Sequence, residues 1–200
     1  MKGRILAAAR RSFARQGYRG TSTRTIAGEA GIDVSTLYYH WGSKLDLFDA
    51  VLADVQLGFE ARLRAWVHAT RDRTLDECLD LGVEHFAGFF MDRDVVRVAL
   101  YSFFDEEFAG KGWAVASQRQ LVETLRTFVE KRFGAAAVPE EFDAAVLALI
   151  ASILALVGSK KHVADILGLD PDGPEYHERV VRTLRRLIGS FARSFESKGE

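Results

Sequence analysis

The segment from residue 21 to residue 47 constrains the fold of this 200-residue chain more than any other stretch. Thr21 and Ser22 carry hydroxyl groups that can accept hydrogen bonds from the free N–H groups in the first turn of a helix. Gly31 suits the left-handed backbone in which helices often end. Asp33 can cap the helix that follows, because a carboxylate suits both its free N–H groups and its dipole. The spacing predicts two short helices joined by a tight turn.

Apolar residues give each of these short helices one inward face. In the first, Ile26, Ala27 and Ala30 form a narrow stripe of mostly small residues, which lets a second helix approach closely. In the second, Leu37 and Trp41 stand four residues apart and are predicted to face inward. The two helices should therefore pack against each other and against the helix before them.

A third helix is predicted directly after this pair. Gly42 breaks the second short helix, and Ser43 with Asp46 makes a shortened capping box. The long helix that begins at Lys44 is expected to run to about Thr70, without a linker. It would connect the N-terminal module rigidly to the rest of the chain.

Outward-facing residues of the second short helix carry hydroxyl, phenol and imidazole groups, which suit contacts to DNA phosphates and base edges. Residues 34–36, near its start, are expected to reach bases, and residues 38–40 mainly phosphates, with some base contact from Tyr39. The competing interpretations are packing for Tyr38, a structural or solvated role for His40, and a merely solvated side chain for Lys44. The predicted DNA-contacting residues are Thr23, Arg24, Thr25, Val34, Ser35, Thr36, Tyr38, Tyr39, His40 and Lys44.

The first 50 residues or so resemble the TetR family of bacterial transcriptional repressors (TetR/AcrR type). Three positions depart from the family's usual residues: Asp33 stands where Ser is common, Ser35 where Gly is frequent, and Trp41 where Phe is usual. The changes at Asp33 and Ser35 are expected to affect operator preference more than the fold. The matching residues are Phe13-Ala14, Gly17-Tyr18, Thr21-Ser22, Ile26-Ala27, Ala30-Gly31-Ile32, Leu37-Tyr38, His40-Trp41, Ser43-Lys44 and Leu47-Phe48.

The remainder of the chain is predicted to be helical as well. It holds only three prolines, and no strand-like alternation persists. We expect an all-α protein of about nine helices, with a helix-turn-helix DNA-binding domain over residues 1–47 and a ligand-binding and dimerisation domain over residues 48–200. Besides the three helices described above, a first helix is predicted at about 2–16 and later ones at about 75–91, 95–108, 113–133, 139–167 and 175–195.

Charge is divided unevenly along the chain. Residues 1–50 hold eight Lys or Arg and four acidic residues, a net charge of +4, whereas the rest holds 19 and 24, a net charge of −5. A basic module on an acidic body fits a protein that offers one face to a polyanion. Cys78 is the sole cysteine, which excludes an internal disulfide and is consistent with a cytoplasmic protein. No signal peptide or membrane span is expected, because the longest apolar run, 144–158, is too short.

The resemblance implies a homodimer that forms through a four-helix bundle of the last two long helices. The run 144–157 is apolar nearly all round, so it must be covered on more than one side. A core within one subunit is the alternative. The residues predicted at the interface are Ile150, Leu154, Val180, Leu184, Leu187, Ile188 and Phe191.

Aromatic residues gather between positions 85 and 113, namely His85, Phe86, Phe89, Phe90, Tyr101, Phe103, Phe104, Phe108 and Trp113, and Trp66 and Phe128 are candidates to join them. The family usually keeps an apolar effector pocket in its body, although simple core packing explains such a cluster about equally well. The predicted pocket residues are Trp66, His85, Phe86, Phe89, Phe90, Arg97, Tyr101, Phe104 and Gln118.

The sequence therefore predicts a ligand-responsive, DNA-binding regulator, most simply a repressor that binds an inverted-repeat operator as a dimer. Its expected partners are operator DNA, a second copy of itself and a small apolar or aromatic effector, with no cofactor, metal or membrane. A regulator without an effector is the alternative. A helical di-iron enzyme is disfavoured, because none of the five histidines has a glutamate three residues before it. The usual motifs of hydrolases and nucleotide-binding enzymes are also missing, so no catalytic residue is expected.

Overall fold

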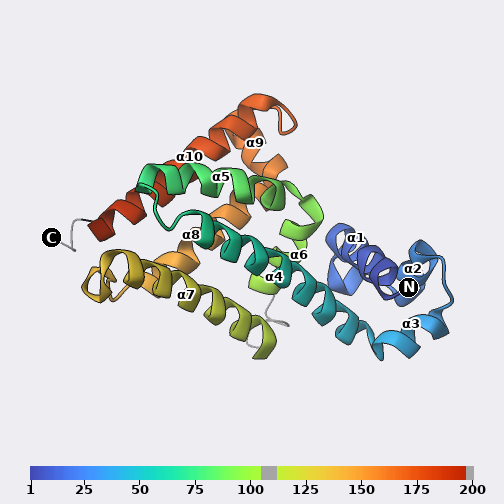
Figure 1. The fold of residues 1–200 in the computed structure, drawn as a ribbon. Coiled ribbons are helices and arrows are strands. Elements are labelled where there is room, and N and C mark those ends of the chain that lie inside the picture. Colours follow the sequence, from blue (N-terminus) through green and yellow to red (C-terminus); the bar gives the residue numbers. More distant parts are fainter. Residues whose placement is uncertain (105–111, 197–200) are drawn as a thin grey trace.

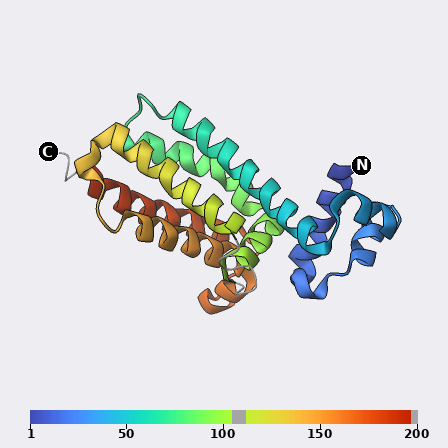
Figure 2. The same ribbon diagram turned by 90° about the horizontal axis from the view of Figure 1, so that it is seen from below.

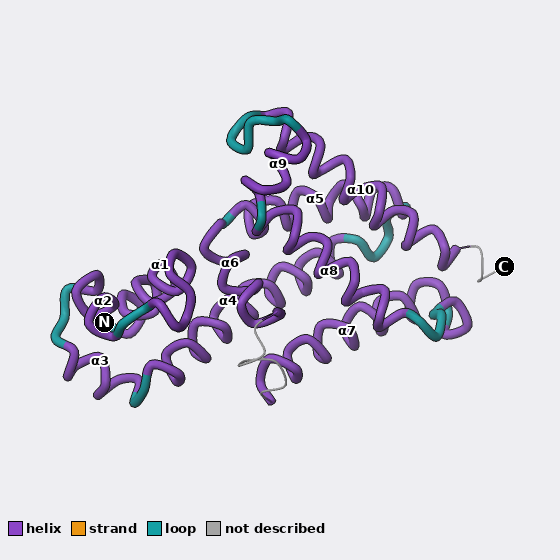
Figure 3. The backbone as a smooth tube through the Cα atoms, turned by 180° about the vertical axis from the view of Figure 1, so that it is seen from behind, coloured by secondary structure: helices purple, strands orange, loops and turns teal. Residues whose placement is uncertain are grey.

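A computed structural model describes residues 1–104 and 112–196, without the side chains of residues 83, 87, 88, 103, 104, 112–117 and 196. The described residues form helices joined by loops, with no strand among them (Figure 3), as the sequence predicts. The elements are α1 (Lys2–Gly20), α2 (Thr23–Ala30), α3 (Val34–Trp41), α4 (Lys44–Ala69), α5 (Leu75–Met91), α6 (Arg93–Phe104), α7 (Gly112–Phe133), the 3-10 turn η1 (Ala135–Ala137), α8 (Phe142–Gly158), α9 (Lys160–Leu167) and α10 (Pro174–Glu196).

The helices form two parts joined by α4 (Figures 1 and 2). Helices α1, α2 and α3 cluster at one end, and α4 runs from α3 into the body, where it lies beside α5 and α7. Helix α6 crosses between the parts and packs on both α1 and α8. The long helix predicted from Lys44 is thus confirmed as a continuous connection.

Three predicted helix ends differ from the structure. The single helix predicted over 139–167 is two helices, α8 and α9, bent by 80° at Ser159. The bend lies where α8 meets α6: a Cβ atom on Gly158 would lie 2.0 Å from Leu100 Cδ1, so glycine permits a close approach of α6 at this end of α8. Pro139 precedes the first turn of α8 rather than lying in it, and α1 continues past a kink at Gly17 to Gly20. The described ranges therefore hold ten α-helices instead of about nine.

Apolar side chains form three clusters. The first cluster holds α1, α2, α3 and α4 together. It includes Phe13, Leu37 and Phe48, all fully buried, and also Val98 of α6. The second packs α7 and α8 against the end of α10, and the third holds α9 to the start of α10. Because Val98 belongs to the first cluster, the body and the N-terminal helices share a core.

A capping box that the sequence analysis did not identify starts α5. The Thr74 hydroxyl accepts a hydrogen bond from the Glu77 backbone N–H, and the Glu77 carboxylate accepts from the Thr74 backbone N–H at 2.7 Å. Hydrogen bonds from the Thr74 backbone and hydroxyl hold the pKa of the Glu77 carboxyl below its ordinary value. The capping box therefore fixes the residue at which α5 begins.

Candidate DNA-binding surface and body cavity

The turn between α2 and α3 is built by local hydrogen bonds. The Ser22 hydroxyl accepts from the Thr25 N–H at 3.0 Å and begins α2. Gly31 ends it with φ at 63°, a left-handed conformation that glycine adopts without cost. The N–H of Ile32 then donates to the Ala27 carbonyl at 3.0 Å, which closes the helix end. These are the signals by which the sequence predicted the turn.

Two predicted caps behave differently. Thr21 is buried, and its hydroxyl donates to the carbonyls of Gly17, at 2.7 Å, and Ser12, so it fixes the end of α1 instead of capping α2. Asp33 stands at the N-cap of α3, but its side chain makes no capping hydrogen bond. Ser43 caps α4 as predicted, since its hydroxyl accepts from the Asp46 N–H.

Helix α3 presents its outer face to solvent while Leu37 anchors it. Leu37 is fully buried, whereas Tyr39 is 86% exposed and Tyr38 is 45% exposed. Ser35 is exposed and Thr36 half-buried, and Val34 packs partly against the first cluster. A short helix held by one buried side chain thus leaves a row of hydroxyl and phenol groups free for contact.

The neighbouring predicted contacts lie around this row. The Thr23 hydroxyl is 3.3 Å from the Tyr38 hydroxyl, so α2 and α3 present adjoining groups. The Thr25 hydroxyl bonds with that of Ser22 at 2.8 Å, and Arg24 is exposed. His40 Nε2 lies 3.3 Å from the Met1 sulfur. The structure therefore brings the predicted residues of α2 and α3 onto one surface.

Lys44 has a second role that the sequence did not reveal. Its ammonium donates to the backbone carbonyls of Tyr18, at 3.0 Å, and Thr21, at 3.2 Å, and lies 4.2 Å from the centre of the Tyr18 ring. The interpretation of Lys44 as a merely solvated lysine is therefore wrong. An ammonium group has three N–H donors, and two of those of Lys44 fasten α4 to the α1–α2 connection.

The body encloses an apolar cavity of about 260 Å³ between α4, α5, α7, α8 and α10. Trp66, Phe86 and Phe90 line it, as predicted, and so does Phe128. The aliphatic lining from α7, α8 and α10, such as Leu121, Ile153 and Leu184, was not assigned to a pocket from the sequence. The only sequence signal for these residues was that they belong to the apolar stripes of their helices.

The other predicted pocket residues lie elsewhere. Phe89 is buried beside Phe59 but does not line the cavity, and Tyr101 lies against Gly17 of α1 instead. His85 Nδ1 lies 3.1 Å from the Leu81 carbonyl oxygen, outside the lining. Neither Arg97 nor Gln118 lines the cavity either. The side chains of Phe103, Phe104, Phe108 and Trp113 lie outside the described residues.

The predicted dimer stripe faces mainly into the subunit. Leu154 and Val180 are buried, so their placement at a subunit interface is corrected. Helix α10 turns its apolar side inward because it packs closely on α5, where Gly189 approaches Leu79. Leu187, at 45% exposure, points outward. The stripe residues that line the cavity are Ile150, Val180, Leu184, Ile188 and Phe191.

Other site types receive no support from the described part of the chain. No group of three or more His, Cys, Asp or Glu side chains there is placed to hold a metal ion. Cys78 is buried beside the cavity, and burial raises the pKa of its thiol, which disfavours the reactive thiolate. Within the same ranges no helix alone is long and apolar enough to cross a membrane, although α8 and α9 pass on length and composition together, across their bend.

Comparison with known proteins agrees with this architecture. Residues 5–51 match the family described as bacterial regulatory proteins, tetR family. A TetR-like transcriptional regulator from Rhodococcus sp. RHA1 is 25% identical, with a TM-score of 0.64 over 92% of this chain and 91% of that one. No curated protein matches the chain.

Two further structures share the fold at lower identity. FadR from Bacillus subtilis, solved with stearoyl-CoA, is 17% identical with a TM-score of 0.68, over 95% of this chain and 98% of that one. AibR, solved with isovaleryl coenzyme A and operator DNA, is 18% identical with a TM-score of 0.66, over 92% of this chain and 95% of that one. Both family and fold are those of transcriptional regulators rather than enzymes. The family match covers the helix-turn-helix at residues 5–51 and the shared fold covers nearly the whole chain, so the N-terminal module is that of tetR-family regulators and the chain as a whole has the fold of TetR-like transcriptional regulators.

Proposed function

We propose that this protein is a ligand-responsive repressor, which acts in the cytoplasm and binds an inverted-repeat operator as a homodimer. The observation that carries the proposal is the exposed outer face of α3, with Tyr39 at 86% exposure, on a module of net charge +4. Two such helices in successive major grooves would lie about 34–36 Å apart. Residues 34–36 would read bases, while Tyr38, Tyr39, His40 and Lys44 would bind mainly phosphates.

Self-association would use the outer faces of α8 and α10. Leu187 of α10 is exposed there, and so are Ala144, Ala148 and Ala155 along α8. Small side chains on α8 permit close approach of a second helix. The inward-facing stripe residues would then support the interface from behind instead of contacting the partner.

The effector would bind in the body cavity and release DNA by a population shift. FadR and AibR were each solved with an acyl coenzyme A ligand, and the cavity of this chain has an almost wholly apolar lining. An effector releases operator only if it prefers the DNA-incompetent arrangement of the two modules. Helix α6, which packs on both α1 and α8, is positioned to connect the cavity side with the DNA side.

Replacing Lys44 by methionine should weaken binding to all DNA sequences about equally. Methionine keeps the apolar stem near Tyr18 but removes the ammonium, so each subunit loses about one phosphate contact and the salt slope of log K falls by about one unit per Lys44. Thr36→Ala should instead change the preferred operator. Fluorescence anisotropy over a salt series, and selection from random DNA, measure the two effects.

Lys161→Met is the matched control for this experiment, because Lys161 is exposed on α9 in the body. Its salt slope should equal that of the wild type. A wild-type slope for Lys44→Met, in a variant that melts like the wild type, would remove Lys44 from the phosphate contacts. An unchanged consensus for Thr36→Ala would show that Thr36 reads no base.

An effector that enters the cavity should weaken operator affinity by about 5–150-fold, the usual range of allosteric coupling. A titration of medium-chain and aromatic compounds against the complex with a selected operator measures this. Compounds that bind the body but leave operator affinity unchanged would contradict the effector response and favour a regulator without one.

A further inference from the structure

A basic cleft of about 860 Å³ lies between the last turns of α4, the α4–α5 turn and α7. The α4–α5 turn and the end of α7 lie at the end of the body remote from α1–α3 (Figure 1). Four cationic side chains line it, against the single carboxylate of Glu123. The cations are Arg71, Arg73, Lys131 and Arg132.

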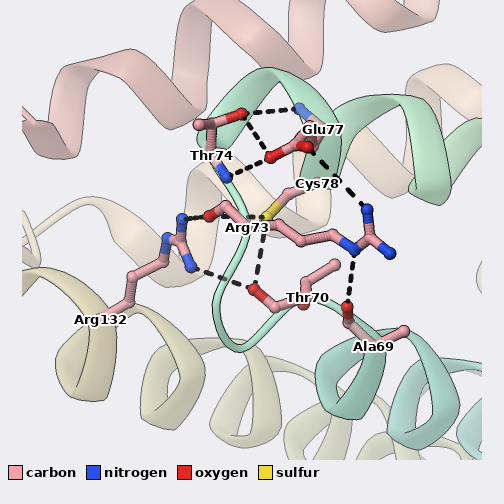
Figure 4. A network of polar contacts seen from close by, with 7 residues as sticks. All are labelled: Ala69, Thr70, Arg73, Thr74, Glu77, Cys78 and Arg132. Carbon is pink, nitrogen blue, oxygen red and sulfur yellow. Dashed lines mark hydrogen bonds and ion pairs between the residues drawn. The ribbon is translucent and has the colours of Figure 1, made fainter.

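Arg132 is held at the inner wall of this cleft. Its guanidinium donates to the carbonyl oxygens of Thr70, at 3.2 Å, and Arg73 (Figure 4). Its Nε atom is buried and has no hydrogen-bond partner in the described part of the chain. Neutral carbonyls satisfy donors but do not neutralise charge, so Arg132 keeps a net positive charge at a partly buried position.

The other cations leave the cleft positive. Arg73 has a carboxylate of Glu77 at 3.9 Å, a weak exposed pair. Arg71 and Lys131 are exposed and form no ion pair among the described residues. A concave surface with this excess of positive charge attracts anions.

The cleft and the apolar cavity share a wall. Phe128, Arg132 and Phe133 line both of them. Phe128 lies against Trp66, with ring centres 5.0 Å apart, and the Arg132 guanidinium lies 5.5 Å from the Phe133 ring. One layer of side chains thus separates a positive, solvated space from a space whose other lining is almost wholly apolar.

We propose that the body binds an amphipathic anion: its apolar chain fills the cavity past Phe128, and its carboxylate or phosphate stays in the cleft beside Arg71, Lys131 and Arg132. This inference rests on the proposed function, since it names the chemical class of the effector. About 30 Å³ per heavy-atom group, the share of a water molecule in the liquid, gives a cavity of 260 Å³ room for roughly eight or nine carbon atoms.

Calorimetric titration of the full chain without DNA tests the inference directly. Octanoate should bind about five- to tenfold more tightly than 1-octanol, which has the same chain and no charge, and high salt should reduce this preference. Affinity should rise from butyrate to octanoate and then level off. Octyl phosphate and octanoyl-CoA, compared with octanoate, show whether the anion is a carboxylate or a phosphate group, and tighter binding of any of the three than of 1-octanol supports the site.

The double variant Arg71→Gln, Lys131→Gln should lose most of the preference for octanoate over 1-octanol, while both side chains are exposed enough to be replaced without harm to folding. Arg119→Gln, an exposed arginine of α7 outside the cleft lining, is the matched control and should keep it. Binding of octanoate, octyl phosphate and octanoyl-CoA that is no tighter than that of 1-octanol, an anion preference that survives the double variant, or no dependence on chain length would overturn the inference. Octanoate binding that leaves operator affinity unchanged would support the site and contradict the proposed effector response instead.

Discussion

Replacing Phe48 by alanine is expected to lower the free energy of unfolding by about 3–5 kcal/mol, the usual cost of removing a buried phenylalanine ring. Phe48 is fully buried at the start of α4, and its ring centre lies 4.9 Å from that of Phe13 and 5.2 Å from that of Tyr18, both on α1. Alanine leaves a cavity between the helices that hold α3 in place. Urea denaturation monitored by circular dichroism measures the loss, and operator affinity should fall with it.

Leu57→Ala is the control on the same helix. Leu57 is 61% exposed, so its replacement should change stability by no more than about 0.5 kcal/mol. Val98 of α6 belongs to the same cluster as Phe48, so damage at Phe48 should also loosen the contact between the DNA-binding helices and the body. A cost below about 1 kcal/mol for Phe48→Ala would mean that this aromatic cluster is not the core that holds the two parts together.

The parts of the fold that the sequence predicted correctly are those determined within a few residues. Ser22, Gly31 and Ser43 each act on backbone groups at most five positions away, so their residue types suffice to place the ends of α2 and the start of α4. The exposed row on α3 follows equally directly, because burying Leu37 turns Tyr39 outward. Local chemistry therefore predicted the helix-turn-helix and its outward face.

The misassigned residues are those whose partners lie far along the chain. An apolar stripe shows that one helix face is covered, but it does not say by which helix. The stripe on α10 that contains Val180 and Leu184 was therefore assigned to a second subunit, whereas it faces the cavity of its own. The break at Ser159 has no proline to mark it, and beside it Gly158 meets Leu100 of α6, which lies far away in the sequence. Aromatic density likewise did not distinguish Trp66, in the cavity wall, from Tyr101 of α6, which lies against α1.

The basic cleft could not be recognised from the sequence for the same reason. Arg71 and Arg73 lie on the α4–α5 turn and Lys131 and Arg132 at the end of α7, about 60 positions later. Separately, each pair is an ordinary group of charges near a helix end. Only tertiary packing places them around one concavity and next to an apolar cavity.

Replacing Gly17 by alanine should lower the free energy of unfolding by about 3 kcal/mol. Gly17 has φ at 70° and ψ at 172°, a conformation that is essentially restricted to glycine and costs other residues about 1–3 kcal/mol. A Cβ atom there would also lie 3.3 Å from the Tyr101 hydroxyl oxygen, and such overpacking adds about 1 kcal/mol or more. Because Tyr101 belongs to α6, the strain would act on the contact between α1 and the body. Urea denaturation measures the change.

Two companion variants separate the backbone strain from the contact. Gly28→Ala places a methyl group in open space inside α2, so it should stabilise the protein by about 1 kcal/mol. Adding Tyr101→Phe to Gly17→Ala removes the hydroxyl oxygen but keeps the ring carbon Cζ, which also lies 3.3 Å from the new methyl group. The double variant should therefore recover part of the loss due to the contact and none of the loss due to φ. If the double variant recovered nothing, α6 would not press on α1 at this point. If Gly17→Ala were as stable as the wild type, the kink that the Thr21 hydroxyl fixes at the Gly17 carbonyl would not exist in solution.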